Sequence, residues 1–186
     1  MSLVRTLLAC SALCLSFSAT ADPFVLTSPT VIAGERLPPE HVITGFGCAG
    51  RNLSPALEWH NPPAGTKSFA VTMFDPDAPT GSGWWHWVVV NIPAETTGLA
   101  QAAGDADGRA RLLPYGALQT RTDFGAPGFG GACPPVGDKP HRYIFAVHAL
   151  GTAKIELPPD ASAAMASYLI RTNEIGRAVL TALHDR

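Results

Sequence analysis

Proline and glycine are the feature of this sequence that most limits how the chain can fold. The 186 residues contain 17 prolines and 18 glycines, spread along the whole length. Because proline removes a backbone donor and glycine weakens regular structure, only short elements fit between them. Five short apolar or alternating runs do so, at residues 24–27, 56–59, 68–74, 87–92 and 143–149. This pattern predicts a mainly β protein, an antiparallel β-sandwich with long loops.

The first 21 residues have the features of a secretory signal peptide. One early charge, Arg5, precedes the apolar run 7–17, and residues 19–21 form an A-x-A cleavage site. The apolar run is too short to cross a bilayer. We therefore expect cleavage after residue 21 and a mature chain, residues 22–186, that folds as one domain in the periplasm or outside the cell. Cys10, in the sequence LLAC, offers a lipoprotein site as an alternative.

Charge and cysteine content narrow the class of protein. The formal net charge of −2 does not favour binding to nucleic acid or to an acidic membrane surface. No apolar run after the signal peptide is long enough to span a membrane. Cleavage leaves two cysteines, Cys48 and Cys133, in glycine-rich loops. An oxidising compartment favours a disulfide between them, and two buried free thiols are the alternative.

Residues 99–140 depart from the strand pattern. This segment holds many glycines and few apolar runs, and a stretch of this length without regular structure is usually functional or disordered. Its aromatic residues, Tyr115, Phe124 and Phe129, favour an ordered loop region.

The end of the chain changes period. Asp160 follows two prolines and can cap a helix that begins at Ala161. Apolar residues then recur at near-helical spacing, namely Met165, Leu169, Ile175, Val179 and Leu183. Thr172-Asn173 can divide this segment, so we expect one or two C-terminal helices that cover a face of the sandwich.

Carboxylates and histidines gather at the ends of the expected strands. Asp75 and Asp77 directly follow one strand, and His86 and His141 each precede another. A rigid sheet can hold such side chains together although the two histidines are far apart in the sequence.

Three kinds of chemistry fit these residues: metal ligation, general base catalysis on a nucleophile, and hydrogen bonding to an anion. The sequence has no H-x-x-x-H or C-x-x-C spacing and no G-x-S-x-G turn, and a disulfide would disable Cys133, the candidate thiol. Anion binding, without a metal or a cofactor, therefore fits best. The aspartates would pair with the histidines, hold an amine of the ligand, or bond only to their own turn.

Prolines can stiffen the rim of such a site. The candidates are Pro76, Pro79, Pro134 and Pro135. A cis bond between Ala78 and Pro79 would hold the sharp turn after Asp75.

Strand alternation assigns the neighbouring aromatic side chains to faces. It places Trp85 and Trp87 on the face opposite His86. It places Tyr143 on the face of His141, where the hydroxyl group can donate to a ligand.

Three long motifs carry a family resemblance: CAGRNLSPALEW, DPDAPTGSGWWHWVVVNIPA and GACPPVGDKPHRYIFAVHAL. They resemble the phosphatidylethanolamine-binding protein family, and more narrowly its bacterial Raf-kinase-inhibitor-like branch, over residues 24–157. The resemblance implies a β-sandwich with a small anion pocket at one end, ligands such as phosphate or phospho-headgroups, and a possible homodimer. The positions that match the family's pocket are Asp75, Asp77, Pro79, His86, Cys133, Pro135, His141 and Tyr143.

Together these observations support one main function and two alternatives. The main hypothesis is an exported, non-catalytic binding protein for a small phosphate-bearing or carboxylate ligand, such as a phospho-headgroup or a phosphorylated side chain. The first alternative is an inhibitor or interaction protein that acts on a protease, kinase or host protein through residues 99–140. The second is a hydrolase that activates water with His86 and Asp75.

Overall fold

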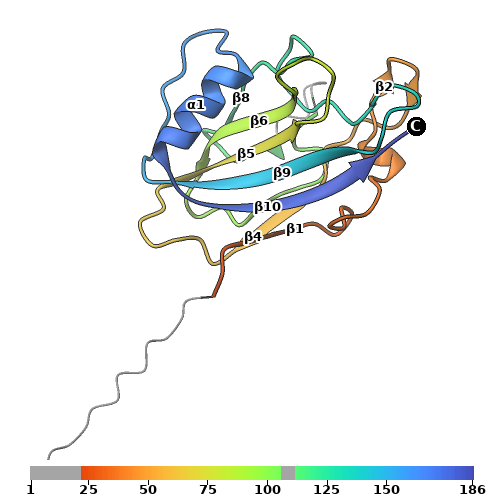
Figure 1. Cartoon of the computed structure of the whole chain (residues 1–186). Coiled ribbons are helices and arrows are strands. Elements are labelled where there is room, and N and C mark those ends of the chain that lie inside the picture. The colour runs from red at the N-terminus through yellow and green to blue at the C-terminus, as the bar shows by residue number, and fades with distance from the viewer. Residues whose placement is uncertain (1–21, 106–111) are drawn as a thin grey trace, which may run out of the picture.

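The computed structural model describes residues 22–105 and 112–186 (Figure 1). The expected signal peptide, with Cys10, lies outside the described residues. In chain order the strands are β1 (Val25–Thr27), β2 (Thr44–Gly45), β3 (Cys48–Ala49), β4 (Leu57–His60), β5 (Ser68–Asp75), β6 (Trp84–Pro93), β7 (Gly98–Leu99), β8 (Leu118–Gln119), β9 (His141–Leu150) and β10 (Glu174–His184). A 3₁₀ turn (Pro39–His41) and the helix α1 (Ala163–Asn173) complete the elements. The five strands expected from the sequence correspond to β1, β4, β5, β6 and β9.

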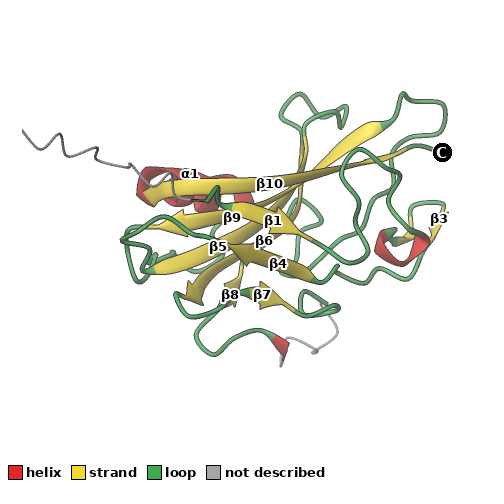
Figure 2. Cartoon of the chain, turned by 90° about the horizontal axis from the view of Figure 1, so that it is seen from below, coloured by secondary structure: helices red, strands yellow, loops and turns green. Residues whose placement is uncertain are grey.

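Two antiparallel sheets face each other. The larger sheet has the strand order β10-β9-β5-β6-β8, and the smaller has the order β1-β4-β7. Figure 2 shows β1 and β4 lying over β5 and β6. Aromatic side chains fill the space between the sheets, for example Trp59 of β4 against Phe69 of β5 with ring centroids 5.3 Å apart. The expected antiparallel sandwich is confirmed.

The helix α1 covers the outer face of the larger sheet (Figure 1). Its buried residues, Ala163, Ala166 and Ile170, pack with Val88 and Val90 of β6. The helix begins two residues later than expected because Ser162 caps it, accepting a hydrogen bond from the Met165 amide at 3.2 Å. The expectation of a C-terminal helix over one face is confirmed, with Ser162 in place of Asp160 as the cap.

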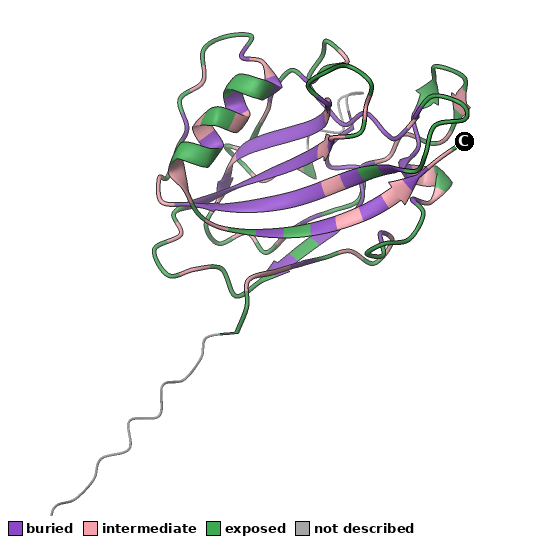
Figure 3. Ribbon diagram, in the orientation of Figure 1, coloured by how far each residue is buried: buried purple, intermediate pink, exposed green. Residues whose placement is uncertain are grey.

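The segment after α1 is a strand, so a second helix was the wrong expectation. β10 pairs with β9 from Glu174 opposite Leu150 to His184 opposite His141. Its buried and exposed residues alternate in Figure 3, as they must in a strand with one face on the core. Val179, taken as a helical contact, is 54% exposed.

A β-bulge in β6 decides where its aromatic residues point. Met73 of β5 pairs with Trp87, and Phe74 pairs with Trp85, so His86 is an extra residue between them. Trp85 packs against the helix-side cluster, opposite to His86 as expected. Trp87 lies in the core between the sheets, which corrects the expected alternation.

Candidate functional site

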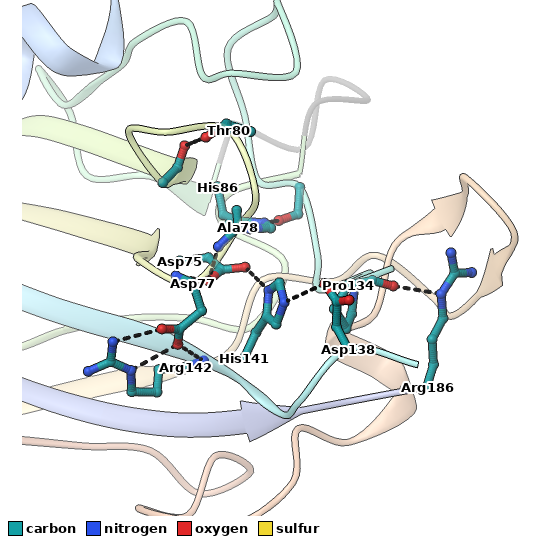
Figure 4. A network of polar contacts seen from close by, with 12 residues as sticks. Asp75, Asp77, Ala78, Thr80, His86, Pro134, Asp138, His141, Arg142 and Arg186 are labelled. Atoms are coloured by element: carbon teal, nitrogen blue, oxygen red, sulfur yellow. Dashed lines mark hydrogen bonds and ion pairs between the residues drawn. The ribbon is translucent and has the colours of Figure 1, made fainter. Parts of the chain in front are cut away.

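A cavity of about 340 Å³ lies at the edge of the larger sheet where β5 ends and β6 and β9 begin. Seven of the eight site residues expected from the sequence line it: Asp75, Pro79, His86, Cys133, Pro135, His141 and Tyr143. Asp77 does not. Figure 4 shows the polar residues of this region converging from three separate segments of the chain.

The carboxylate of Asp75 organises the floor of the cavity. Its Oδ1 atom accepts hydrogen bonds from the amides of Asp77 at 2.8 Å and Ala78 at 3.1 Å. Its Oδ2 atom accepts from Nδ1 of His141 at 2.8 Å. Two of the three roles considered for this aspartate therefore occur at once, since one carboxylate shapes its own turn and holds a histidine.

His141 is enclosed by carboxylates. Besides Asp75, its Nε2 atom lies 3.3 Å from Oδ2 of Asp138. Burial pulls the pKa of His141 down, but the hydrogen bonds and charges of Asp75 and Asp138 outweigh burial and raise this pKa above its ordinary value. His141 is thus favoured in its charged form, with both N–H groups already donating inside the protein.

His86, in contrast to His141, is favoured in its neutral form. Its Nδ1 atom lies 2.8 Å from the carbonyl oxygen of Gly130, which fixes the tautomer with the proton on Nδ1. Its Nε2 atom makes no hydrogen bond within the described residues. Burial is the largest influence on the pKa of His86 and lowers it, so the imidazole is neutral near pH 7. One ring nitrogen on the cavity wall is therefore left for a ligand.

Aromatic rings form the wall beside His86. The ring of Phe124 lies 5.3 Å from Trp84, 5.4 Å from His86 and 6.0 Å from Phe46, centroid to centroid. Tyr143 packs on the other side of His86 at 5.2 Å, and burial raises the pKa of its hydroxyl group. Phe46 and Phe124 were not among the residues expected from the sequence.

The rim is held by a disulfide and by prolines. Cys48 of β3 is bonded to Cys133, which ties the β2–β3 hairpin to the loop before β9. Pro134 and Pro135 follow in that loop and line the cavity, while Pro76 does not. The cis bond expected before Pro79 is absent, because the described residues contain only trans peptide bonds.

Asp77 serves a neighbouring contact outside the cavity. It bonds to the guanidinium of Arg142 at 2.7 and 2.8 Å and to the Arg142 amide at 2.9 Å. The hydrogen bond from Arg142 is the main reason that the pKa of Asp77 falls to about 2. Two aspartates of one motif thus face different partners.

Other chemistries find less support in this geometry. Asp75 bonds to His141 and not to His86, so the pair expected for water activation is not formed. Within residues 22–105 and 112–186, no group of three or more histidine, cysteine, aspartate or glutamate side chains is placed to hold a metal ion. No helix in that part of the chain is long and apolar enough to cross a membrane.

Comparison with known proteins agrees with this fold. The model of the phosphatidylethanolamine-binding protein family matches residues 27–185. The chain belongs to this family. It is 54% identical over 171 residues to the UPF0098 protein YbcL of Escherichia coli, covering 92% of both chains. It is 52% identical over 150 residues to the UPF0098 protein YbhB of the same organism, covering 81% of this chain and 92% of YbhB.

Solved structures of family members have the same fold. The crystal structure of E. coli YbcL, described as a new member of the mammalian PEBP family, superposes with a TM-score of 0.85 at 55% identity, covering 88% of this chain and 98% of YbcL. A putative PEBP homologue from Chlamydia trachomatis gives a TM-score of 0.70 at 24% identity, covering 88% of this chain and 97% of its own, and supports the fold alone.

Proposed function

We propose that this family member is an exported, non-catalytic binding protein whose cavity takes a phosphate-bearing or carboxylate ligand. The observation that carries the proposal is the free ring nitrogen of His86 on the wall of a preformed cavity. A neutral imidazole next to a bound anion gains a proton at Nε2, and the resulting N–H donates a charge-assisted hydrogen bond.

The size and lining of the cavity suggest which ligands fit. Its volume of about 340 Å³ lies in the range of small-molecule sites. The free ring nitrogen of His86 suits a charged group, and the wall of Trp84 and Phe124 suits an apolar body. A phospho-headgroup or a phosphorylated side chain combines both features.

The disulfide supports the proposed location. Bonds such as Cys48–Cys133 persist in oxidising compartments, which fits a periplasmic or secreted protein after removal of residues 1–21. Mass spectrometry of the protein from its native host would test this, with Asp22 as the expected first residue. Detection of intact Met1 would reject cleavage.

A titration tests the binding site. Isothermal calorimetry should detect phosphate, phosphoethanolamine or phosphotyrosine with the wild-type protein, and His86→Ala should abolish the heat. His60→Ala is the matched control, because His60 is exposed on β4 away from the cavity. Unchanged binding by His86→Ala, or loss of binding by His60→Ala alone, would contradict the site.

Enzyme assays test the non-catalytic part of the proposal. The wild-type protein and His86→Ala should both be inactive on generic phosphoester and ester substrates. Turnover by the wild-type protein that His86→Ala removes would reassign the cavity to a hydrolase.

One observation favours a second function, recognition of a protein partner through residues 99–140. Tyr115 is 100% exposed, and Leu112 and Leu118 are about half exposed, so apolar side chains gather in that segment. Replacement of Tyr115 and Leu118 by serine should remove partners from a pull-down while phosphate binding is kept. Unchanged partners would reject this function.

A further inference from the structure

Arg186, the last residue of the sequence, lies at the cavity because of the β9–β10 pairing. The final pair of that ladder joins His184 to His141, the first residue of β9. Arg186 lies two positions further on, past the end of the strand, and its side chain lines the cavity. Figure 4 shows it next to Pro134.

Three contacts fix the arginine in place. Its Nε atom donates to the carbonyl oxygen of Pro134 at 2.6 Å. Its Nη1 atom lies 3.5 Å from Sγ of Cys48. Its backbone oxygen accepts from the amide of Gly137 at 3.1 Å. A Cβ atom at Gly47 would lie 2.9 Å from Nη1, so the glycine leaves room for the guanidinium.

The remaining charges of the cavity do not attract an anion by themselves. The positive charge favoured on His141 is balanced by the carboxylates of Asp75 and Asp138, and both of its N–H groups are used. His86 is neutral in the free protein. Among the described residues that line the cavity, Arg186 is the only lysine or arginine. Arginine keeps its charge at all relevant pH values.

We propose that Arg186 is a ligand-binding residue that supplies the fixed positive charge for the anion. The guanidinium uses Nε to hold the Pro134 loop, and Nη2, which makes no hydrogen bond within the described residues, is left to donate to a ligand oxygen. This inference rests on the proposed anion-binding function and adds a residue to it. His86 would supply part of the cavity wall and a titratable hydrogen-bond donor, and Arg186 would supply the positive charge.

A set of arginine variants tests the assignment by calorimetry with inorganic phosphate and with acetate. Arg186→Gln should weaken phosphate binding about tenfold or more, since a charge-assisted hydrogen bond is lost. Arg186→Lys should restore part of that loss because it keeps the charge. Arg177→Gln, the same change at an exposed position on β10, should have no effect.

The ratio of the two affinities separates a charge role from a structural one. A fixed positive charge favours phosphate, which carries more charge than acetate, so Arg186→Gln should lower the phosphate-to-acetate affinity ratio. An equal loss for both ligands would mean that Arg186 only holds the Pro134 loop, and would overturn the proposal. Phosphate binding by Arg186→Gln within twofold of wild type, while His86→Ala abolishes it, would also overturn it and leave the anion site standing. No binding by the wild-type protein would reject both.

Discussion

Strand β9 carries a buried histidine paired with a carboxylate near each of its ends. At the beginning, Nδ1 of His141 bonds to Asp75 at 2.8 Å. Near the end, Nδ1 of His148 bonds to Glu174 at 2.5 Å. Each histidine also has a partner at Nε2: Asp138 at 3.3 Å in the first pair and Thr72 at 3.0 Å in the second. The two pairs are chemically alike.

Their surroundings differ. The His148 pair joins β9 to β5 and to the start of β10, at the end of the sheet that α1 covers. The His141 pair lies among loops that a disulfide and prolines hold, next to a cavity and to a second histidine with a free nitrogen. A histidine–carboxylate pair therefore occurs at both ends of the sheet and does not by itself mark a binding site. The neighbouring His86 and the open space beside it distinguish the candidate site.

Removal of the disulfide should have the largest effect and should act on one end only. Cys48→Ser combined with Cys133→Ser opens a link between residues 85 positions apart and should cost roughly 2–4 kcal/mol in the free energy of unfolding. Urea denaturation measures this loss. Hydrogen exchange should quicken at the β2–β3 hairpin and around Pro134, while the amides around His148 keep their protection. Equal loosening at both ends would contradict the division into two regions.

The two carboxylates provide the next test. Asp75→Asn removes a buried charge that accepts three hydrogen bonds and should cost about 3 kcal/mol in stability. Glu174→Gln should cost about 1 kcal/mol, because its partner His148 keeps the bond to Thr72. Only the change at Asp75 should also weaken phosphate binding, as measured by NMR titration of the folded variants. A similar loss of affinity in Glu174→Gln would show that the pair itself makes the site.

Much of the larger sheet is predictable from the sequence, and the exceptions have physical causes. Runs rich in valine and aromatic residues between prolines and glycines identify β5, β6 and β9. β10 escapes detection because its buried positions include alanines and its exposed face includes Ile175 and Val179. The large side chains therefore repeat every four residues, as in a helix. The alternation of a strand is visible only at the buried residues Ala178, Leu180 and Ala182.

The expectation of a helix in place of β10 also prevented part of the site from being predicted. A helix in place of β10 gives no register to carry Arg186 to His141, so the arginine could not be expected at the cavity. The position of Trp87 depends on a bulge that leaves no sequence signal. Phe46 had one available signal, since a disulfide at Cys133 brings the residues near Cys48 to the same rim.

The pH dependence of anion binding is the next test of the difference between the two ends of β9, because only the cavity end lies beside His86. Sulfate is a suitable probe because its charge is constant between pH 6 and 8. A bound anion raises the lowered pKa of His86, so binding takes up a proton. As the pH rises from the pKa of His86 in the free protein to its pKa in the complex, affinity should fall by up to about tenfold per pH unit. Calorimetry in two buffers of different ionisation enthalpy counts the proton, and His86→Gln should abolish its uptake. Uptake that persists in His86→Gln would assign the proton to another group.

The lowered pKa of His86 has the opposite effect on the stability of the ligand-free protein, which should decrease as the pH falls. The unfolded state, in which His86 titrates near its ordinary value of 6.5, binds the proton more readily than the native state. The contribution of neutral His86 to stability is therefore lost as the pH falls below that value. His86→Gln should remove this part of the acid destabilisation, which thermal melts between pH 5 and 7 can follow.

The smallest effect is expected at Asp77, two residues from Asp75 in the sequence. Its ion pair with Arg142 is partly exposed, so Asp77→Asn should cost only about 0.5 kcal/mol at pH 7, after allowance for solvent screening. Because the pKa of Asp77 is lowered to about 2, this contribution is present above its ordinary value of 3.8 and is lost as the pH falls toward 2. Urea denaturation at pH 7 measures the difference, and phosphate affinity should not change. An affinity loss equal to that of Asp75→Asn would place Asp77 in the binding site, because a carboxylate that only holds Arg142 has no means of affecting a ligand in the cavity.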